Sequence, residues 1–199
     1  MIFMKDYRKD IASYISLETA VLQELDTDQI NDVLNILEQA LDEGRAIYIF
    51  GNGGSAATAS HFQNDFNKGV SEHTEKKFRF QCLNDNVATI LAIANDIGYE
   101  EIFRFQLQGK LNKGDIVIAI SGSGNSDNVL RAVEYAKEIQ AVVIGMTGFS
   151  GGKLKDLCDY PLHVPVRSMQ ITEDIHMVLD HLMMSIFYKS LCGIDHRKE

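Results

Sequence analysis

The chain has 199 residues, of which 45% are hydrophobic and 24% charged, as is ordinary for one globular domain with a sizeable core. Its net charge of −9 argues against nucleic-acid binding, so any phosphate must be recognised locally. The three cysteines are widely spaced, and the first ten residues hold no apolar run. We therefore expect reduced thiols in a cytoplasmic protein without a leader or a membrane segment.

Two amphipathic helices are predicted at the N-terminus, over residues 5–24 and 27–44. The second carries apolar residues at helical spacing, with Asp26 or Thr27 as its N-cap. Because both precede the first strand, we expect a helical hairpin (1–44) that packs across a sheet edge or against another subunit. Together with an α/β core over 45–199, it is expected to form a single domain, 1–199.

From residue 46 short apolar runs alternate with helical segments. Strands are predicted at 46–50, 78–83, 115–120, 141–146 and 160–164. Helices are predicted at 55–68, 87–94, 99–109, 126–138, 152–157 and 171–192. This alternation indicates an α/β fold with a five-stranded parallel, doubly wound (flavodoxin-like) sheet, whose ligands bind at the carboxyl ends of the strands.

Two of these strands run into loops rich in glycine and serine. Residues 51–55 (GNGGS) follow the first strand, and residues 121–126 (SGSGNS) follow the third. Hydroxyl and helix-start N–H groups in such loops can hold a phosphate without lysine or arginine. A serine-rich turn with an N-cap at Ser126 would explain the second loop alone, but two such loops favour a phosphate ester. The pattern fits neither a dinucleotide fingerprint nor a Walker motif.

Histidines and carboxylates lie on the helices after the first strand and at the end of the chain. His61 and Asp65 share a helix face, and the last helix carries Glu173, His176, Asp180 and His181. The set His61, Asp65, Glu173 and His181 would suit zinc. Glu173 and His181 are two helical turns apart, so their convergence on one ion requires the helix to bend or a side chain to reach along it. Ordinary packed histidines are the alternative.

Taken together, these motifs resemble the SIS (sugar isomerase) domain family. They are GNGGS, the His61-Phe62 pair followed by Asp65, Asn95-Asp96 with Gly98-Tyr99, SGSGNS, the Thr147-Gly148 and Gly151-Gly152 pairs, and the histidines of the last helix. Within the family the chain is most similar to the phosphoheptose (sedoheptulose-7-phosphate) isomerases, over nearly its whole length. The resemblance implies the SIS fold, a homotetramer with active sites at subunit interfaces, and an early step towards heptoses of lipopolysaccharide, capsule or other glycans.

The resemblance also implies roles for particular residues. Asp65 and His181 match the acid/base pair of an aldose–ketose isomerase that works through an enediol, and Zn²⁺ is bound in some members by His61, Asp65, Glu173 and His181. Contacts to the sugar phosphate are implied for Asn52, Gly53, Gly54, Ser55, Asp65, Asn95, Asp96, Ser121, Gly122, Ser123, Ser126 and Glu173.

Three positions depart from the family's pattern. Asp65 stands where Glu is usual, Glu173 where Gln is usual, and Gly122 where Thr is usual. The first two changes retain or add capacity to bind metal, and they put the particular sugar in question. The alternatives are an isomerase of a different sugar phosphate, a non-catalytic relative that binds the bacterial replication initiator, and a regulatory sugar-phosphate-binding module. The presence of Asp65 and His181 favours the enzyme.

Overall fold

The computed structural model describes residues 5–195 of the chain. Within that range the strands are β1 (Ile47–Gly51), β2 (Phe80–Cys82), β3 (Ile116–Ser121), β4 (Val142–Thr147) and β5 (Tyr160–His163). The α-helices are α1 (Arg8–Gln23), α2 (Thr27–Glu43), α3 (Gly54–Asn64), α4 (Val87–Asp96), α5 (Arg104–Leu107), α6 (Asp127–Glu138), α7 (Gly152–Leu157) and α8 (Met169–Cys192). In this described part, no helix is both long and apolar enough to cross a bilayer.

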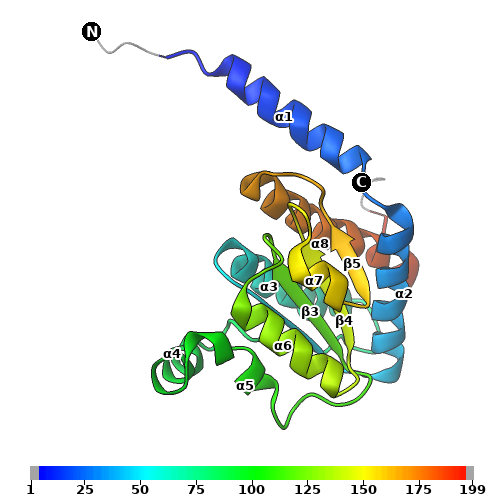
Figure 1. Ribbon diagram of the computed structural model, residues 1–199. Helices are drawn as coiled ribbons and strands as arrows, with labels where there is room; N and C mark the ends of the chain where they lie inside the picture. The colour runs from blue at the N-terminus through cyan, green and yellow to red at the C-terminus, as the bar shows by residue number, and fades with distance from the viewer. Residues whose placement is uncertain (1–4, 196–199) are drawn as a thin grey trace.

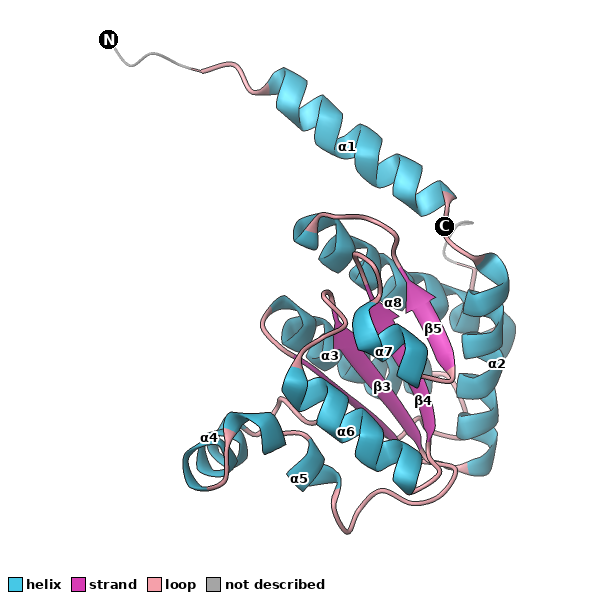
Figure 2. Ribbon diagram, in the orientation of Figure 1, coloured by secondary structure: helices cyan, strands magenta, loops and turns pink. Residues whose placement is uncertain are grey.

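The strands form one parallel sheet in the order β2-β1-β3-β4-β5 (Figure 2). This confirms the doubly wound, flavodoxin-like fold expected from the sequence. Chain order reverses between β1 and β3, which pair from Ile47 with Ile116 to Gly51 with Ile120. In such sheets the crevice at the carboxyl ends of the two strands at the reversal point is the usual place for a ligand.

Helices cover both faces of the sheet, because alternate strand residues point to opposite sides. Ile47 and Ile49 of β1 face a core formed with α2, α3 and α8, whereas Tyr48 and Phe50 face a core formed with α4 to α7. The strands are therefore apolar on both faces, as a buried parallel sheet requires. Figure 1 shows this layered arrangement.

The two N-terminal helices form where they are predicted, but they do not form a closed hairpin. Asp26 caps α2, and Val33 and Leu37 of that helix are buried in the first core. In Figure 1, α1 extends away from the body of the molecule instead of folding back along α2. Its apolar residues remain exposed, with Ile11 at 55% and Ile15 at 57%. The last turn of α1 packs on the body through Val21, while the apolar side chains of Ile11 and Ile15 stay largely exposed within the described chain.

Local differences from the predicted elements concern segments with weak patterns. The helix expected over 99–109 is a 3₁₀ turn (Tyr99–Glu101) followed by the short α5, and β2 is shorter than the strand expected over 78–83. The helix expected over 55–68 divides into α3 and a π-helical segment, η1 (Asp65–Val70). Such π turns inside helices frequently occur at functional sites.

Candidate active site

The loops that follow β1 and β3 line a pocket at the reversal point of the sheet. Its volume is about 240 Å³. The lining residues are Asn52, Gly53, Gly54, Ser55, Ile120, Ser121, Gly122, Ser123, Ser126, Met169 and Glu173. The structure therefore brings together the two loops that the sequence analysis assigned to phosphate binding, and it adds the first turns of α8.

Neither α3 nor α6, the helices that follow the two loops of this pocket, is capped by a side chain. Gly53 precedes α3, and Ser126 precedes α6 with its hydroxyl 3.1 Å from the hydroxyl of Ser121. Asp26, Asn86 and Ser168, by contrast, cap α2, α4 and α8. Uncapped N–H groups at the positive end of a helix dipole favour an anion. The pocket's described lining offers hydroxyl and N–H groups and includes no lysine or arginine.

Glu173 of α8 closes one side of the pocket by lying against the backbone of Gly54. A Cβ atom on residue 54 would lie 2.5 Å from Cδ of Glu173, and a Cβ on residue 122 would lie 2.6 Å from Sδ of Met169. Both glycines thus leave room for side chains of α8.

Asn52 is held at the pocket by two neighbours. Its Nδ2 donates to Asn128 Oδ1 at 2.9 Å, and its Oδ1 accepts from Asn128 Nδ2 and Tyr99 Oη, each at 3.0 Å. Asn95 and Asp96 instead lie exposed on α4 and outside the pocket lining, where Asn95 donates to Asp96. In this structure Tyr99, and not the predicted Asn-Asp pair, connects that segment to the pocket.

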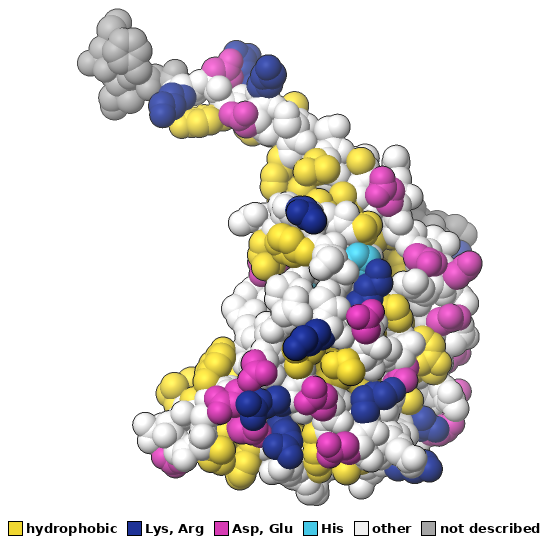
Figure 3. Space-filling model, in the orientation of Figure 1, with side chains coloured by type: hydrophobic (Ala, Val, Ile, Leu, Met, Phe, Trp, Pro, Cys, Tyr) yellow, Lys and Arg dark blue, Asp and Glu magenta, His cyan; other side chains and the backbone are white. Residues whose placement is uncertain are grey.

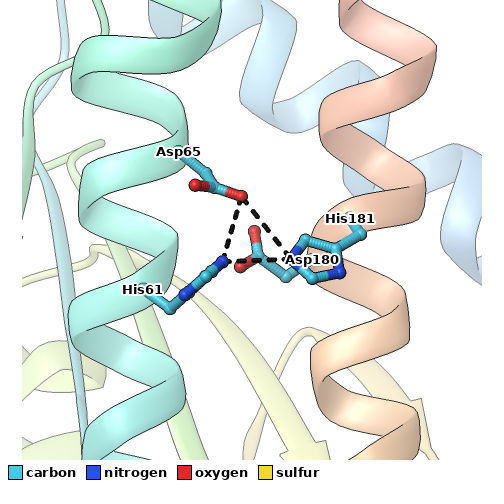
Figure 4. A group of neighbouring side chains, drawn as sticks. All are labelled: His61, Asp65, Asp180 and His181. Carbon is cyan, nitrogen blue, oxygen red and sulfur yellow. Dashed lines mark hydrogen bonds and ion pairs between the residues drawn. The ribbon is translucent and has the colours of Figure 1, made fainter. Parts of the chain in front are cut away.

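A second cluster lies where α3 and α8 run side by side, two helical turns beyond the pocket (Figure 4). His61 Nε2 is 3.0 Å from His181 Nε2 and 3.3 Å from Asp65 Oδ2, and His181 Nε2 is 3.9 Å from Asp65 Oδ2. These three atoms form a triangle. Ligand atoms of a tetrahedral zinc ion are about 3.3 Å apart, given Zn–N bonds of about 2.0–2.1 Å. The three donor atoms therefore have the spacing of a metal site.

Asp65 lies one helical turn after His61, where α3 ends and the π-helical segment begins. It begins η1, and its side chain is only 9% exposed. Its Oδ2 faces the two histidines, while its Oδ1 accepts a hydrogen bond from Asn64 Nδ2 at 3.1 Å. One carboxylate oxygen of Asp65 is thus directed at the two histidines, and the other is hydrogen-bonded to Asn64.

The fourth member of the cluster is Asp180, whereas the sequence analysis placed Glu173 there. Donor atoms of His61, Asp65, Asp180 and His181 all lie within 4.8 Å of one another. Glu173 lies at the pocket, because the two helical turns to His181 span about 12 Å. Burial, together with the charge of Asp65, raises the pKa of Asp180 to about 8. The sequence analysis noted Asp180, but its burial between two helices is visible only in the fold.

His176 does not belong to either group, which agrees with the interpretation of a packed histidine. Its ring is buried, and its Nε2 lies 3.4 Å from the carbonyl oxygen of Thr147. Burial lowers the pKa of His176 to about 4, against the opposing effect of the contact with Thr147. The imidazole is therefore neutral near pH 7 and serves the core of the protein.

Comparisons with known proteins agree on one family. The family model described as the SIS domain matches residues 7–148. The phosphoheptose isomerase of Helicobacter hepaticus is 38% identical over 167 residues, covering 84% of either chain, and that of Aneurinibacillus thermoaerophilus is 34% identical over 203 residues, covering 94% of this chain and 96% of the relative. Solved phosphoheptose isomerases of Neisseria gonorrhoeae and Francisella tularensis superpose with TM-scores of 0.83 and 0.85. Each is 28% identical, with 92% of this chain and 98% of the other covered.

Proposed function

This chain belongs to the SIS domain family and is a sugar-phosphate isomerase, and we propose that it converts sedoheptulose 7-phosphate to D-glycero-D-manno-heptose 7-phosphate. The curated relatives named phosphoheptose isomerase support this substrate, since the chain covers most of their length. The loops and the cluster described above supply the groups that such a reaction needs.

The observation that carries the proposal is the spacing between the pocket and the cluster. Gly54 and His61 are two helical turns apart on α3, which is about 10 Å along the helix axis. An open chain of seven carbons with a terminal phosphate reaches about 10 Å, at the length per bond of an extended chain. Phosphate in the pocket would therefore place the first carbons of a heptose at the cluster.

The pocket is proposed to hold the phosphate. Ser55, Ser121, Ser123 and Ser126 offer hydroxyl groups there, and the uncapped starts of α3 and α6 offer N–H groups. Fixing the far end of the sugar would restrict the motion of its reacting end, which lowers the entropic cost of reaction. Asn52 and Glu173, which line the same pocket, would contact hydroxyl groups along the chain.

The cluster is proposed to move protons. In the ketose-to-aldose direction a base removes a proton from C1, a second proton passes from O1 to O2, and a proton is returned to C2. We assign the carbon-bound proton to His181 and the proton on the oxygens to Asp65. Groups that act as general acids and bases typically contribute about 10²- to 10⁴-fold each.

The same cluster is proposed to bind Zn²⁺ through His61, Asp65 and His181, because the spacing of their donor atoms fits tetrahedral coordination. A bound zinc ion supplies Lewis acidity towards a carbonyl oxygen. Ligation and proton transfer compete for Nε2 of His181 and Oδ2 of Asp65. Rates measured with and without metal therefore decide which role these atoms have during turnover.

We further propose that the protein works in the cytoplasm as a homotetramer, in a pathway that leads to heptose-containing glycans. The support for assembly is the exposed apolar side chains of α1, among them Ile11, Ile15 and Leu17. Figure 3 shows hydrophobic side chains gathered along this part of the surface. Leu91 of α4 and Ile97, which follows that helix, are also more than half exposed, and a second copy could cover them.

The test is to incubate the purified protein with sedoheptulose 7-phosphate and to follow the product by NMR, with fructose 6-phosphate as a shorter ketose phosphate. We expect turnover of the heptulose phosphate and little of the shorter sugar, whose carbonyl end would not reach the cluster. Preferential turnover of a different sugar phosphate would overturn the heptose assignment. A parallel assay after verified metal removal should lose activity, and full activity there would reject only the catalytic metal.

A further inference from the structure

Asp180 is a buried carboxyl group for which the fold supplies no partner. Its relative exposure is 0%, and neither oxygen has a hydrogen-bond partner within residues 5–195. Buried carboxyl groups in proteins are normally paired, hydrogen-bonded or bound to a metal ion, because leaving them unpartnered is unfavourable. The position of Asp180 therefore calls for a ligand.

The carboxyl group points into the cluster. Figure 4 shows it between α3 and α8, directed towards the space bounded by His61, Asp65 and His181. The four donor atoms lie within 4.8 Å of one another. The His61 and His181 side chains are 41% and 55% exposed, whereas Asp180 is buried, so the histidines approach this space from the solvent side and Asp180 from the core.

We propose that Asp180, and not Glu173, completes the metal site formed by His61, Asp65 and His181. The donor set is then two imidazoles and two carboxylates, which suits a divalent cation such as Zn²⁺. This inference rests on the metal site of the proposed function and identifies its fourth ligand.

Charge balance supports this assignment. Two carboxylates cancel the double positive charge of the ion, so the loaded site carries no net charge although one of its members is fully buried. The donor atoms of Asp65 and Asp180 lie within 4.8 Å of each other. An ion between the two carboxylates gives the unpartnered oxygens of Asp180 a partner.

Glu173 is occupied elsewhere. Its carboxyl group lies against Gly54 and lines the pocket, two helical turns from His181. Joining the cluster would require Glu173 to leave the pocket wall and reach along the axis of α8. The position of Asp180, one residue before His181, needs no such movement.

The test measures metal binding directly, without substrate. The full chain is stripped with a chelator and titrated with Zn²⁺ in competition with a chromophoric chelator, and with Co²⁺ by visible absorption. Asp180→Asn should weaken Zn²⁺ binding by about 10- to 100-fold or more and should change the Co²⁺ spectrum. Glu173→Ala is the control, since it removes a carboxylate from the same helix and leaves no side-chain oxygen at residue 173, and it should bind Zn²⁺ as the unaltered protein does.

The proposal is overturned if Glu173→Ala weakens binding as much as Asp180→Asn, or if Asp180→Asn binds normally. Should Asp180→Asn fail to fold, crystals of the unaltered protein loaded with Zn²⁺ decide the matter. An anomalous peak about 2.0–2.2 Å from an Asp180 oxygen supports the proposal, and a peak beyond reach of that residue rejects it. Turnover of the heptulose phosphate without metal binding would reject this inference but support the proposed isomerase function. Asp180-dependent metal binding without turnover would support this inference but reject the proposed substrate.

Discussion

His61 and His181 meet at their Nε2 atoms, 3.0 Å apart, although 120 residues separate them in the chain. At this distance one ring nitrogen must donate to the other, or both must direct lone pairs at a shared cation. Since Asp65 Oδ2 lies 3.3 Å from the His61 nitrogen, the contact belongs to a cluster of donor atoms. The predictions below follow from this contact and from the pocket two helical turns away.

Replacing His181 on the last helix should abolish most of the turnover without abolishing binding of the sugar phosphate. For His181→Gln we expect kcat to fall by about 10²- to 10⁴-fold, because a proton-transfer group is lost. Binding of the sugar phosphate, measured by calorimetry, should persist. His73→Gln changes a partly exposed histidine outside the cluster and should keep normal kcat. Normal turnover by His181→Gln would refute the assigned role of His181.

Removing a hydroxyl group from the pocket should act mainly on binding. Ser55→Ala deletes a buried hydroxyl at the start of α3 that we assign to the phosphate. Hydrogen bonds to charged groups contribute about 1.5–3 kcal/mol, so KM should rise by about 10- to 100-fold. Ser60→Ala, on the same helix but bonded to Asp85, is the control. An unchanged KM for Ser55→Ala would place the phosphate elsewhere.

Adding a methyl group at residue 54 should test how closely α3 packs against α8. In Gly54→Ala the new Cβ would displace the Glu173 carboxyl group, the end of a flexible side chain, so we expect a loss of at most about 1 kcal/mol in unfolding free energy and a lower kcat/KM. Urea denaturation measures the first effect. Shortening the opposing side chain in Gly54→Ala/Glu173→Ala should restore much of the stability, and strict additivity of the two changes would contradict the contact.

The buried His176 should make the protein less stable in mild acid. In the folded state the pKa of His176 is lowered from 6.5 to about 4, so between these values the unfolded chain binds more protons there. Unfolding free energy therefore falls as pH falls through this window, by up to about 1.4 kcal/mol per pH unit from this group. His163, which also has a lowered pKa, and Asp180, whose pKa is raised, titrate nearby.

Because these neighbours contribute as well, the measurement is a difference between two proteins. Urea titrations of unaltered protein and His176→Gln should show a steeper loss of stability on acidification in the unaltered protein. Parallel curves from pH 6.5 to 4 would mean that His176 is protonated in the folded state.

Placing charge on the exposed apolar face of α1 should prevent assembly. Ile11 and Ile15 lie one helical turn apart on that face. We expect Ile15→Glu to shift the protein from tetramers to smaller species in analytical ultracentrifugation, because a subunit contact would have to bury the new charge. Ser13→Glu, on the same helix but away from Ile11 and Ile15, should remain assembled. A monomeric unaltered protein would reject the proposed tetramer.

Local patterns accounted for most of the fold. The apolar β-branched runs predicted all the strands of the sheet, and the loops at 51–55 and 121–126 predicted where the pocket would lie. Errors arose where the pattern was short, as in 99–109, or where most of a helix extends away from the body, as in α1. An amphipathic pattern shows that a helix has an apolar face, but it does not show what covers that face.

By itself the sequence determined the parallel α/β architecture, the two phosphate-type loops and the presence of His61, Asp65 and His181 on two helices, because these depend on residue type and short spacing. Only the tertiary structure decided which side chains meet. Parallel packing of α3 against α8 puts Glu173 beside Gly54 and places Asp180 beside Asp65 and His61. The rise of α8 keeps Glu173 and His181 about 12 Å apart along the helix, so one belongs to the pocket and the other to the cluster.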